Sequence, residues 1–229
     1  MTDFNEVLKG RKTVALLKVI REELKIKPRR ILVVGCGSGL EAGMLAREFQ
    51  AEAYGIDLVE EFDFDHAGSH PATLMKMDAR DLRFEDAYFD FVFSFHALEH
   101  IPGPDKALAE MARVLAPGGA YVVGTPNKAR LVGYVDSARP LRQKIKFNLV
   151  DLGMRLRGRW SNEQGAHAGF SLGELKSLCA TAFGSSQAVS DAYYHRLYAS
   201  KKGLLDLLTR LGVKSFVYPC IYVAGSKRM

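Results

Sequence analysis

The chain has 229 residues, of which 48% are hydrophobic and 25% charged, a composition that argues against wholesale disorder and fits one large α/β domain. No apolar run approaches the roughly 18–20 residues that span a bilayer, and residues 1–12 lack the apolar stretch of a signal peptide. The three cysteines show no metal-ligand spacing, so we expect no metal site, reduced thiols and a cytoplasmic location.

The first half of the chain predicts alternating helices and strands. Residues 5–25, inside an N-terminal helical segment at 1–27, carry apolar side chains at helical spacing. Short apolar runs and amphipathic stretches then follow one another along the chain. We predict strands at 30–34, 53–57, 73–77 and 89–95, and helices at 40–49 and 105–115.

The second half continues this alternation after one long interruption. A turn at 117–119 leads into a strand at 121–124, and residues 127–168 are then too long for a simple βα connection, which predicts a partly helical, lid-like insertion. We predict a helix at 171–183, a strand at 187–194, a helix at 203–211 and a strand at 216–224. Repeated β-α units indicate one doubly wound α/β domain over residues 1–229, with a mostly parallel sheet covered by helices on both faces.

The net charge of +6 is concentrated in the insertion. Residues 128–160 hold nine Lys or Arg and two Asp, which gives this segment +7 and the rest of the chain −1. Apolar residues recur among them at helical spacing: Leu141, Ile145, Leu149, Leu152 and Leu156. Three interpretations remain open: a solvated face, recognition of an anionic substrate, or peripheral contact with an anionic membrane surface. Nucleic acid is not an expected partner, because aromatic residues are not interleaved with the basic ones.

A glycine-rich turn, Val34-Gly35-Cys36-Gly37-Ser38-Gly39, follows the first predicted strand and opens a helix. Glycines let a backbone turn sharply and approach a ligand closely, and the helix that follows presents free N–H groups. Asp57 ends the second predicted strand, 22 residues after Gly35, where a carboxylate can accept both hydroxyls of a ribose. The pair predicts a nucleotide-like cofactor.

Six segments together resemble a class I methyltransferase dependent on S-adenosylmethionine, of the methyltransferase type 11 kind found in ubiquinone and menaquinone biosynthesis. The segments are ILVVGCGSG, GID, MDARDL, FDFVFSFHALEHI, RVLAPGGAYVVGTPN and HAGFSLGELKSLCATAF, covering about residues 28–126 and 167–183. The resemblance implies a seven-stranded sheet of order 3-2-1-4-5-7-6 and S-adenosylmethionine as the cofactor, with S-adenosylhomocysteine as its product.

The resemblance also implies roles for individual residues. The glycines would flank the methionine part of the cofactor, Asp57 would hold the ribose, Asp78 beside Ala79 would hold the adenine amino group, and residues 94–96 would line the floor near the sulfonium. The expected cofactor site consists of Gly35, Cys36, Gly37, Gly39, Asp57, Leu58, Asp78, Ala79, Ser94 and Phe95. One position departs from the family pattern: Val33 stands where an acid often orients the amino acid part, and Glu41 is a candidate substitute.

Three histidines are candidates for a catalytic base, which methyl transfer requires only when the acceptor carries a proton. His96 and His100 follow the fourth predicted strand, and His167 ends the insertion before a helix that resembles one abutting the family's active site. A structural role remains an alternative for His96 and His100. No role is predicted for His66, His70 or His195.

The sequence therefore predicts methyl transfer to a small-molecule, lipid-linked or glycan-linked acceptor, with an oxygen as the methylated atom and an anionic acceptor as one option. One alternative is a non-catalytic protein that binds the same cofactor as a sensor or scaffold. Another is an NAD(P)-dependent short-chain dehydrogenase, because Gly37, Gly39 and Ala42 fit a dinucleotide fingerprint and Tyr198 and Lys202 mimic a Tyr-x-x-x-Lys motif. That tyrosine lies too near the C-terminus for the dehydrogenase fold.

Overall fold

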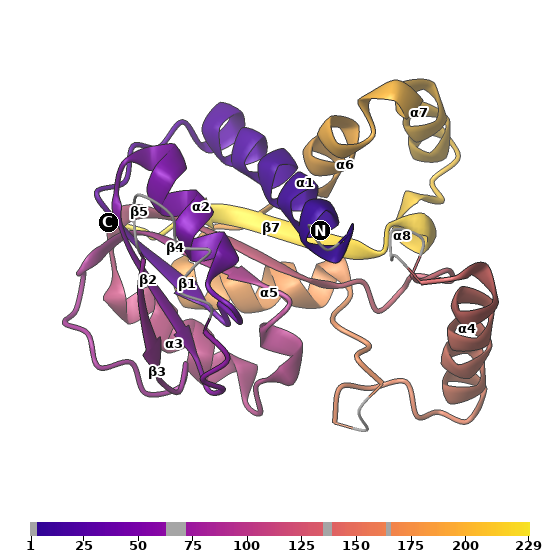
Figure 1. The fold of residues 1–229 in the computed structure, drawn as a ribbon, viewed down its shortest axis with the longest axis horizontal. Coiled ribbons are helices and arrows are strands. Elements are labelled where there is room, and N and C mark those ends of the chain that lie inside the picture. The colour runs from indigo at the N-terminus through magenta and orange to yellow at the C-terminus, as the bar shows by residue number, and fades with distance from the viewer. Residues whose placement is uncertain (1–3, 63–71, 135–138, 164–165) are drawn as a thin grey trace.

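A computed structural model describes residues 4–62, 72–134, 139–163 and 166–229, with side chains from residue 11 onward (Figure 1). Within it, seven strands form one sheet in the order β3-β2-β1-β4-β5-β7-β6. The strands are β1 (Arg30–Val34), β2 (Glu52–Asp57), β3 (Thr73–Lys76), β4 (Phe89–Phe95), β5 (Leu115–Pro126), β6 (Gln187–Ala188) and β7 (Cys220–Ser226). The first five pair in parallel, and β7 runs antiparallel to both β5 and β6. The predicted fold class and strand order are confirmed.

Helices cover both faces of the sheet (Figure 1). The helices are α1 (Phe4–Val19), α2 (Leu40–Phe49), α3 (Pro104–Val114), α4 (Leu141–Leu156), α5 (Leu172–Phe183), α6 (Ser190–Leu197), α7 (Lys202–Arg210) and α8 (Lys214–Val217). A π-helical turn at Ile20–Leu24 extends α1, and 3-10 turns lie at Leu98–His100 and Ala199–Lys201. Across the described residues, no helix combines the length and apolarity that crossing a bilayer requires.

Alternate residues of the central strands build two separate cores. Ile31 and Val33 of β1 point to the core shared with α1, α2 and α6, whereas Leu32 and Val34 point to the core shared with α3 and α5. All four side chains are at most 1% exposed. Because both faces are buried, the strand reads as an uninterrupted apolar run, and this run made it recognisable in the sequence.

The C-terminal third departs from the sequence prediction. The predicted strand at 187–194 ends at Ala188, and Ser190–Leu197 forms α6, because two neighbouring side chains, Tyr193 and Tyr194, must both be buried. A strand would place them on opposite faces, whereas α6 packs both into the core with α1 and β7. The predicted last strand at 216–224 is shifted: 214–217 is helical and β7 begins at Cys220.

The predicted turn at 117–119 lies inside β5 as an irregularity of the sheet. Leu115 pairs with Phe89 and Ala120 pairs with Phe91, so the residues between Leu115 and Ala120 bulge out of the ladder. Gly118 takes a positive φ of 75° there. The bulge lies at the end of β5 opposite the site described below, so it does not affect the cleft.

The insertion after β5 is closed at its base. Asn127 and Phe170 form an isolated parallel bridge, Lys128 N–H donates to the Phe170 carbonyl at 2.9 Å, and Phe170 N–H donates to the Pro126 carbonyl at 3.1 Å. Gly169 sits in this closure at a φ of 74°, where a Cβ would overlap the Pro126 carbonyl. Helix α4 projects from this base, away from the sheet (Figure 1).

Candidate functional site

The glycine-rich turn leaves β1 at the carboxyl end of the sheet and takes three positive φ values. Gly35, Gly37 and Gly39 have φ of 73°, 50° and 91°. A Cβ on Gly35 would overlap Ala97, whereas one on Gly37 would meet no atom within 4 Å. Gly35 is therefore required by packing, and the open space above Gly37 allows a ligand to approach the backbone.

Asp57 binds the turn from the end of β2. Its Oδ2 accepts the Gly37 N–H at 2.9 Å, and its Oδ1 accepts the Val59 N–H at 3.2 Å. The Gly35 and Cys36 N–H groups donate to the neighbouring Ile56 carbonyl at 2.8 and 3.0 Å. The predicted glycine turn and the predicted acid therefore form one hydrogen-bonded unit at the cleft.

A cavity of about 310 Å³ opens on the β2 and β3 side of this turn, and we term it the nucleoside-side cavity. Asp57, Leu58, Asp78, Ala79, His100 and Pro102 are among its lining residues. Leu58 and Val59 remain 53% and 55% exposed there, apolar surface of the kind that a flat ring covers. Arg80 donates from Nε and Nη2 to the Asp78 carboxylate, and this contact lowers the pKa of Asp78. An adenine amino group would share that carboxylate with Arg80.

A second cavity, of about 330 Å³, lies on the α1 and α2 side of the turn, and we term it the methionine-side cavity. Lys12, Cys36, Ser38, Glu41, Phe95 and His96 are among its lining residues. Val33, which stands where the resembled family often has an acid, lines it too but offers no charge. Lys12 and Glu41 supply opposite charges to the same space, which suits the carboxylate and ammonium of an amino acid. Burial, followed by the nearby Asp57 charge, raises the pKa of Cys36 to about 12, so that thiol is neutral.

A third cavity, of about 300 Å³, lies between the ends of β5 and β7, α6 and the insertion, and we term it the acceptor-side cavity. Aromatic side chains form much of its wall, namely Phe95, Tyr134, Tyr193, Tyr194 and Tyr222. Lys12, Arg130, His167 and Cys220 bring polar groups to it. Among the residues that the structure describes, His96 alone lines all three of these cavities, so they meet around its ring.

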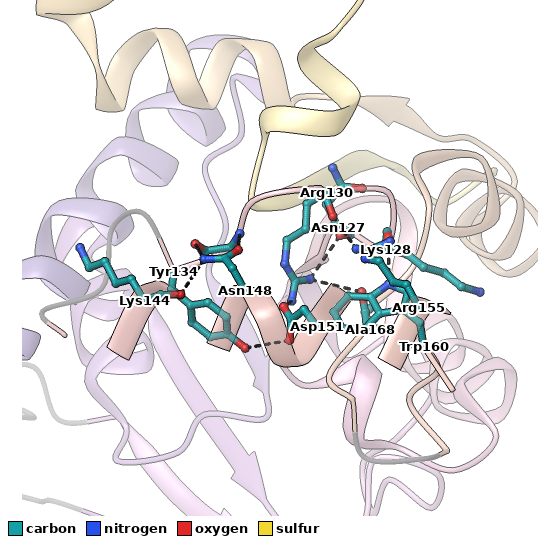
Figure 2. A network of polar contacts seen from close by, with 12 residues as sticks. Asn127, Lys128, Arg130, Tyr134, Lys144, Asn148, Asp151, Arg155, Trp160 and Ala168 are labelled. Atoms are coloured by element: carbon teal, nitrogen blue, oxygen red, sulfur yellow. Dashed lines mark hydrogen bonds and ion pairs between the residues drawn. The ribbon is translucent and has the colours of Figure 1, made fainter. Parts of the chain in front are cut away.

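Arg130 is anchored by the insertion (Figure 2). Its Nη2 lies 3.4 Å from Asp151 Oδ2 on α4, and its guanidinium lies 5.0 Å from the centre of the Trp160 ring. Arg155 stacks on the same ring at 4.2 Å and donates to the Arg130 carbonyl. Burial raises the pKa of Asp151, and burial together with Arg130 lowers the pKa of Arg155. These contacts hold α4 against Arg130, which lines the acceptor-side cavity.

The structure brings the three predicted histidines together. The rings of His100 and His167 lie edge to face with centroids 4.8 Å apart, so they connect the nucleoside-side and acceptor-side cavities. His96 Nε2 lies 3.3 Å from Cys220 Sγ, and its Nδ1 lies 3.3 Å from Glu99 Oε1. Burial lowers the pKa of His96, but Cys220 and Glu99 outweigh it and raise the pKa to about 10.

Two residues of the expected cofactor site, Ser94 and Gly39, are not among the lining residues of the three cavities. Ser94 is fully buried in β4 and does not line the three cavities, whereas its neighbour Phe95 does. Gly39 precedes α2 with a φ of 91°, and a Cβ there would overlap the Leu74 side chain at 2.5 Å, so packing also requires a glycine at this position. His195 pairs with Asp206 at 3.0 Å outside the cavities, and His66 and His70 lie outside the described residues.

Sequence reasoning missed the site residues that come from distant segments. Lys12 lies on α1, Arg130 follows β5, Tyr193 lies on α6 and Cys220 begins β7. None of them belongs to a local motif, and each was a plain helix, loop or strand residue in the sequence. Only the fold could place them around His96.

Residues 32–123 match a protein family described as a methyltransferase domain. The chain is similar to tocopherol O-methyltransferase of Arabidopsis thaliana, at 34% identity over 56% of this chain and 38% of that protein. It is also similar to norajmaline N-methyltransferase of Rauvolfia serpentina, at 28% identity over 55% of this chain and 45% of that protein. The chain therefore spans less than half the length of these curated relatives.

The fold is also found in solved structures. The YcgJ protein of Bacillus subtilis superposes with a TM-score of 0.59 over 96% of this chain and 99% of that chain, at 19% identity. The likeness in fold thus extends over 96% of the chain, including regions outside residues 32–123.

Proposed function

We propose that this chain, which carries a class I methyltransferase domain, transfers a methyl group from S-adenosylmethionine to a hydroxyl group of an acceptor. One observation carries the proposal: a nucleoside-side, a methionine-side and an acceptor-side cavity meet at His96. The sulfonium of the cofactor lies between its adenosine and its methionine parts. A cofactor that fills the first two cavities would therefore present its methyl group at the mouth of the third.

The residues present fit the cofactor part by part. Asp57 faces the nucleoside-side cavity with a carboxylate that can accept ribose hydroxyls, and Leu58 and Val59 offer apolar surface to the adenine. Lys12 and Glu41 stand in the methionine-side cavity, where they would hold the carboxylate and the ammonium group. The open space above Gly37 leaves room for the cofactor to lie along the turn.

The bound cofactor supplies an activated methyl group, because a thioether is a good leaving group. The chain contributes position: Phe95 and His96 separate the cofactor cavities from the acceptor-side cavity and define where the acceptor atom can stand. Holding the attacking atom, the methyl carbon and the sulfur in line accounts for a large part of the acceleration in such displacements.

The wall of the acceptor-side cavity favours an aromatic or otherwise apolar acceptor that carries a polar or anionic group. Tyr193, Tyr194 and Tyr222 present ring surface, and Lys12 and Arg130 present positive charge. Because Lys12 would hold the carboxylate of the cofactor, Arg130 is the positive charge left for an anionic acceptor, although Asp151 partly offsets it. This combination supports a small or lipid-linked acceptor of that character.

Calorimetry and turnover test this function. S-adenosylhomocysteine should bind with micromolar affinity and raise the melting temperature. At a concentration one hundred times its dissociation constant, the ligand should raise the free energy of unfolding by about 2.7 kcal/mol. Methyl-labelled S-adenosylmethionine incubated with fractionated lipids, glycans and phenols should then label one fraction. Binding of NADH without binding of S-adenosylhomocysteine would show that the cofactor is wrong, and cofactor binding without labelling of any fraction would favour a sensor.

We also propose that α4 attaches the protein to an anionic lipid surface. Its polar residues Asn148, Asp151 and Arg155 contact the rest of the insertion, while an apolar stripe is left exposed. Leu141, Leu149 and Leu156 in this stripe are 72%, 62% and 81% exposed. Basic residues flank the stripe, and the only acid of α4 is the inward-facing Asp151. An exposed apolar stripe bordered by positive charge matches the surface of an anionic bilayer.

A further inference from the structure

A further cavity, of about 180 Å³, lies between α6, α7 and α8, and we term it the α7 groove. Leucine, valine, proline and tyrosine side chains line it, together with Lys201. Lys201 is exposed, so its ammonium group can stay in water while its methylene stem lies along the wall. The groove therefore suits an uncharged, carbon-rich ligand.

Helix α7 leaves much of its apolar side uncovered along this groove. Leu204 and Leu208 lie one turn apart on the same side of the helix and both line the groove, and Leu204 is 53% exposed. Val217 of α8 also lines the groove and is 41% exposed. An amphipathic helix usually buries such a side against a core, so the α7 groove presents apolar surface that a ligand can cover.

The α7 groove and the acceptor-side cavity share a wall. Tyr194 and Pro219 line both of them. The two neighbours of Pro219 divide between them: Tyr218 lines the groove, and Cys220 lines the acceptor-side cavity, where its Sγ lies 3.3 Å from His96 Nε2. Two residues of extended chain span roughly 7 Å, so the groove begins a short distance from the point where the three cavities meet.

Tyr194 is a fixed apolar partition in this shared wall. Its hydroxyl accepts the Cys220 N–H at 2.9 Å and donates to the Cys220 carbonyl at 3.1 Å. Its ring lies against the ring of Tyr218, with the two centroids 4.1 Å apart. Because the backbone at Cys220 holds the hydroxyl, Tyr194 presents mainly ring surface to the cavity and to the groove.

The size of the α7 groove indicates that it receives a part of a ligand. Pockets that enclose a whole drug-sized molecule measure roughly 300–1,000 Å³. The acceptor-side cavity reaches that range at about 300 Å³ and carries polar groups, whereas the groove holds about 180 Å³ and is nearly all apolar. A molecule with a polar head in the cavity can therefore place a narrow apolar chain in the groove.

We propose that the α7 groove holds the hydrocarbon tail of the methyl acceptor, which makes the acceptor a lipid with a hydroxyl-bearing head and an apolar chain. The proposal rests on the proposed methyl transfer, in which the head occupies the acceptor-side cavity. The tail covers Leu204 and Val217 and removes their apolar surface from water. Each methylene that enters the groove adds to this gain until the groove is full.

A series of 4-alkylphenols, from 4-methylphenol through the propyl and pentyl compounds to 4-heptylphenol, tests the groove. Titration calorimetry with S-adenosylhomocysteine present measures their binding without turnover. We expect the affinity of wild-type protein to rise up to about fourfold for each methylene that enters the groove, and to level off once the groove is full. Equal affinities for 4-methylphenol and 4-heptylphenol would overturn the proposal.

Two pairs of exposed residues provide matched variants. Leu204 lines the groove and Leu207 of the same helix does not, although they are 53% and 50% exposed. Val217 lines the groove and its neighbour Phe216 does not, although they are 41% and 46% exposed. We expect Leu204→Glu and Val217→Glu to abolish the dependence of affinity on chain length, whereas Leu207→Glu and Phe216→Glu should retain it.

Two results with these variants would overturn the tail groove. If all four variants lose the dependence on chain length alike, the tail adsorbs to the general apolar surface of α7 and α8. If the mass of wild-type protein in sedimentation rises with concentration and Leu204→Glu alone prevents the rise, the occupant of the groove is a second copy of the chain. Each variant replaces a residue at the surface, so a loss confined to the groove variants does not reflect unfolding.

Turnover of the same compounds with S-adenosylmethionine separates the tail groove from the proposed function. If the 4-alkylphenols are methylated with a KM that falls as the chain lengthens, both proposals are supported. Methylation with the same KM for every chain length would leave methyl transfer intact and overturn the tail groove. Binding that depends on chain length, in a protein that methylates no hydroxyl acceptor, would support an apolar-chain site in the groove and contradict the proposed function.

Discussion

The imidazole rings of His100 and His167 meet edge to face with their centroids 4.8 Å apart. His100 follows β4, and His167 ends the insertion, so this contact joins the Rossmann-like core to the segment that covers the acceptor-side cavity. His167 takes a φ of 45° to make it. Strained residues of this kind cluster at binding and catalytic sites, which makes His167 a position to test by substitution.

We expect His167→Ala and His100→Ala to weaken retention of the cofactor and not its initial binding. A ring pair contributes about 0.5–1.5 kcal/mol, so the dissociation rate of S-adenosylhomocysteine should rise up to about tenfold. Stopped-flow fluorescence of Trp160, which lies in the insertion, measures that rate. His195→Ala provides the control. Dissociation rates that match wild type in both variants would mean that the histidine contact does not close the cleft.

Asp57 is expected to stabilise the glycine turn and to bind the cofactor, and different substitutions separate these two roles. Asp57→Asn keeps an oxygen for the Gly37 N–H but removes the charge, so the fold should persist while the affinity for S-adenosylhomocysteine falls about tenfold. Asp57→Ala also leaves that N–H without its partner and should cost about 1–3 kcal/mol of folding free energy in addition. Titration calorimetry and urea unfolding measure the two effects. An Asp57→Asn protein with wild-type affinity would exclude a ribose contact.

The fold was predictable where a segment carries a clear apolar pattern. The bounds predicted for 30–34, 40–49 and 89–95 agree with β1, α2 and β4 to the residue, because β1 and β4 are apolar runs and α2 follows the glycine turn with apolar residues at helical spacing. The region after residue 186 was not predictable in the same way. Tyr193 and Tyr194 have side chains typical of strands, and only their burial between α1 and β7 makes the segment helical.

The candidate site also has a part that local sequence predicts and a part that it does not. The glycine turn, Asp57 and the histidines lie next to strand ends in short motifs, and the structure gathers them at one edge of the sheet. The acceptor side has no motif, because Arg130 and Cys220 reach it from opposite ends of the second half of the chain. Tertiary structure alone brings Cys220 to His96, and so the sequence could name the histidine but not its partner.

The Arg130–Asp151 ion pair should contribute to the free energy of unfolding by holding the insertion in place. The two side chains are 7% and 13% exposed, so removing one partner leaves a nearly buried charge. Arg130→Met or Asp151→Asn alone should cost about 3 kcal/mol, and the double variant should cost less than the sum of the two. Urea unfolding of wild type, the two single variants and the double variant completes this double-mutant cycle. Strict additivity would show that the pair does not hold α4 in place.

Attachment to an anionic surface should depend on exposed basic residues of the insertion. Arg155 does not qualify, because it stacks on Trp160 and binds the Arg130 carbonyl, so its reversal would disturb the insertion itself (Figure 2). Arg142, Lys146 and Arg157 are exposed beside the apolar stripe. Each contributes about 1 kcal/mol near an anionic bilayer, an attraction that salt screens within a Debye length.

Liposome flotation then tests the attachment with matched variants. Wild-type protein should float with vesicles containing phosphatidylserine at low salt, should not float with neutral vesicles, and should detach as salt rises. The triple charge reversal of Arg142, Lys146 and Arg157 should abolish flotation, and Leu149→Ser with Leu156→Ser should weaken it at every salt concentration, because these leucines contribute apolar contact rather than charge. S-adenosylhomocysteine affinity should stay the same in all of them, since the cofactor cavities lie beside β1 and not on α4. If wild-type protein does not bind anionic vesicles at low salt, α4 does not bind lipid. If only the leucine variant loses binding, the contact is apolar and the basic residues form a solvated face.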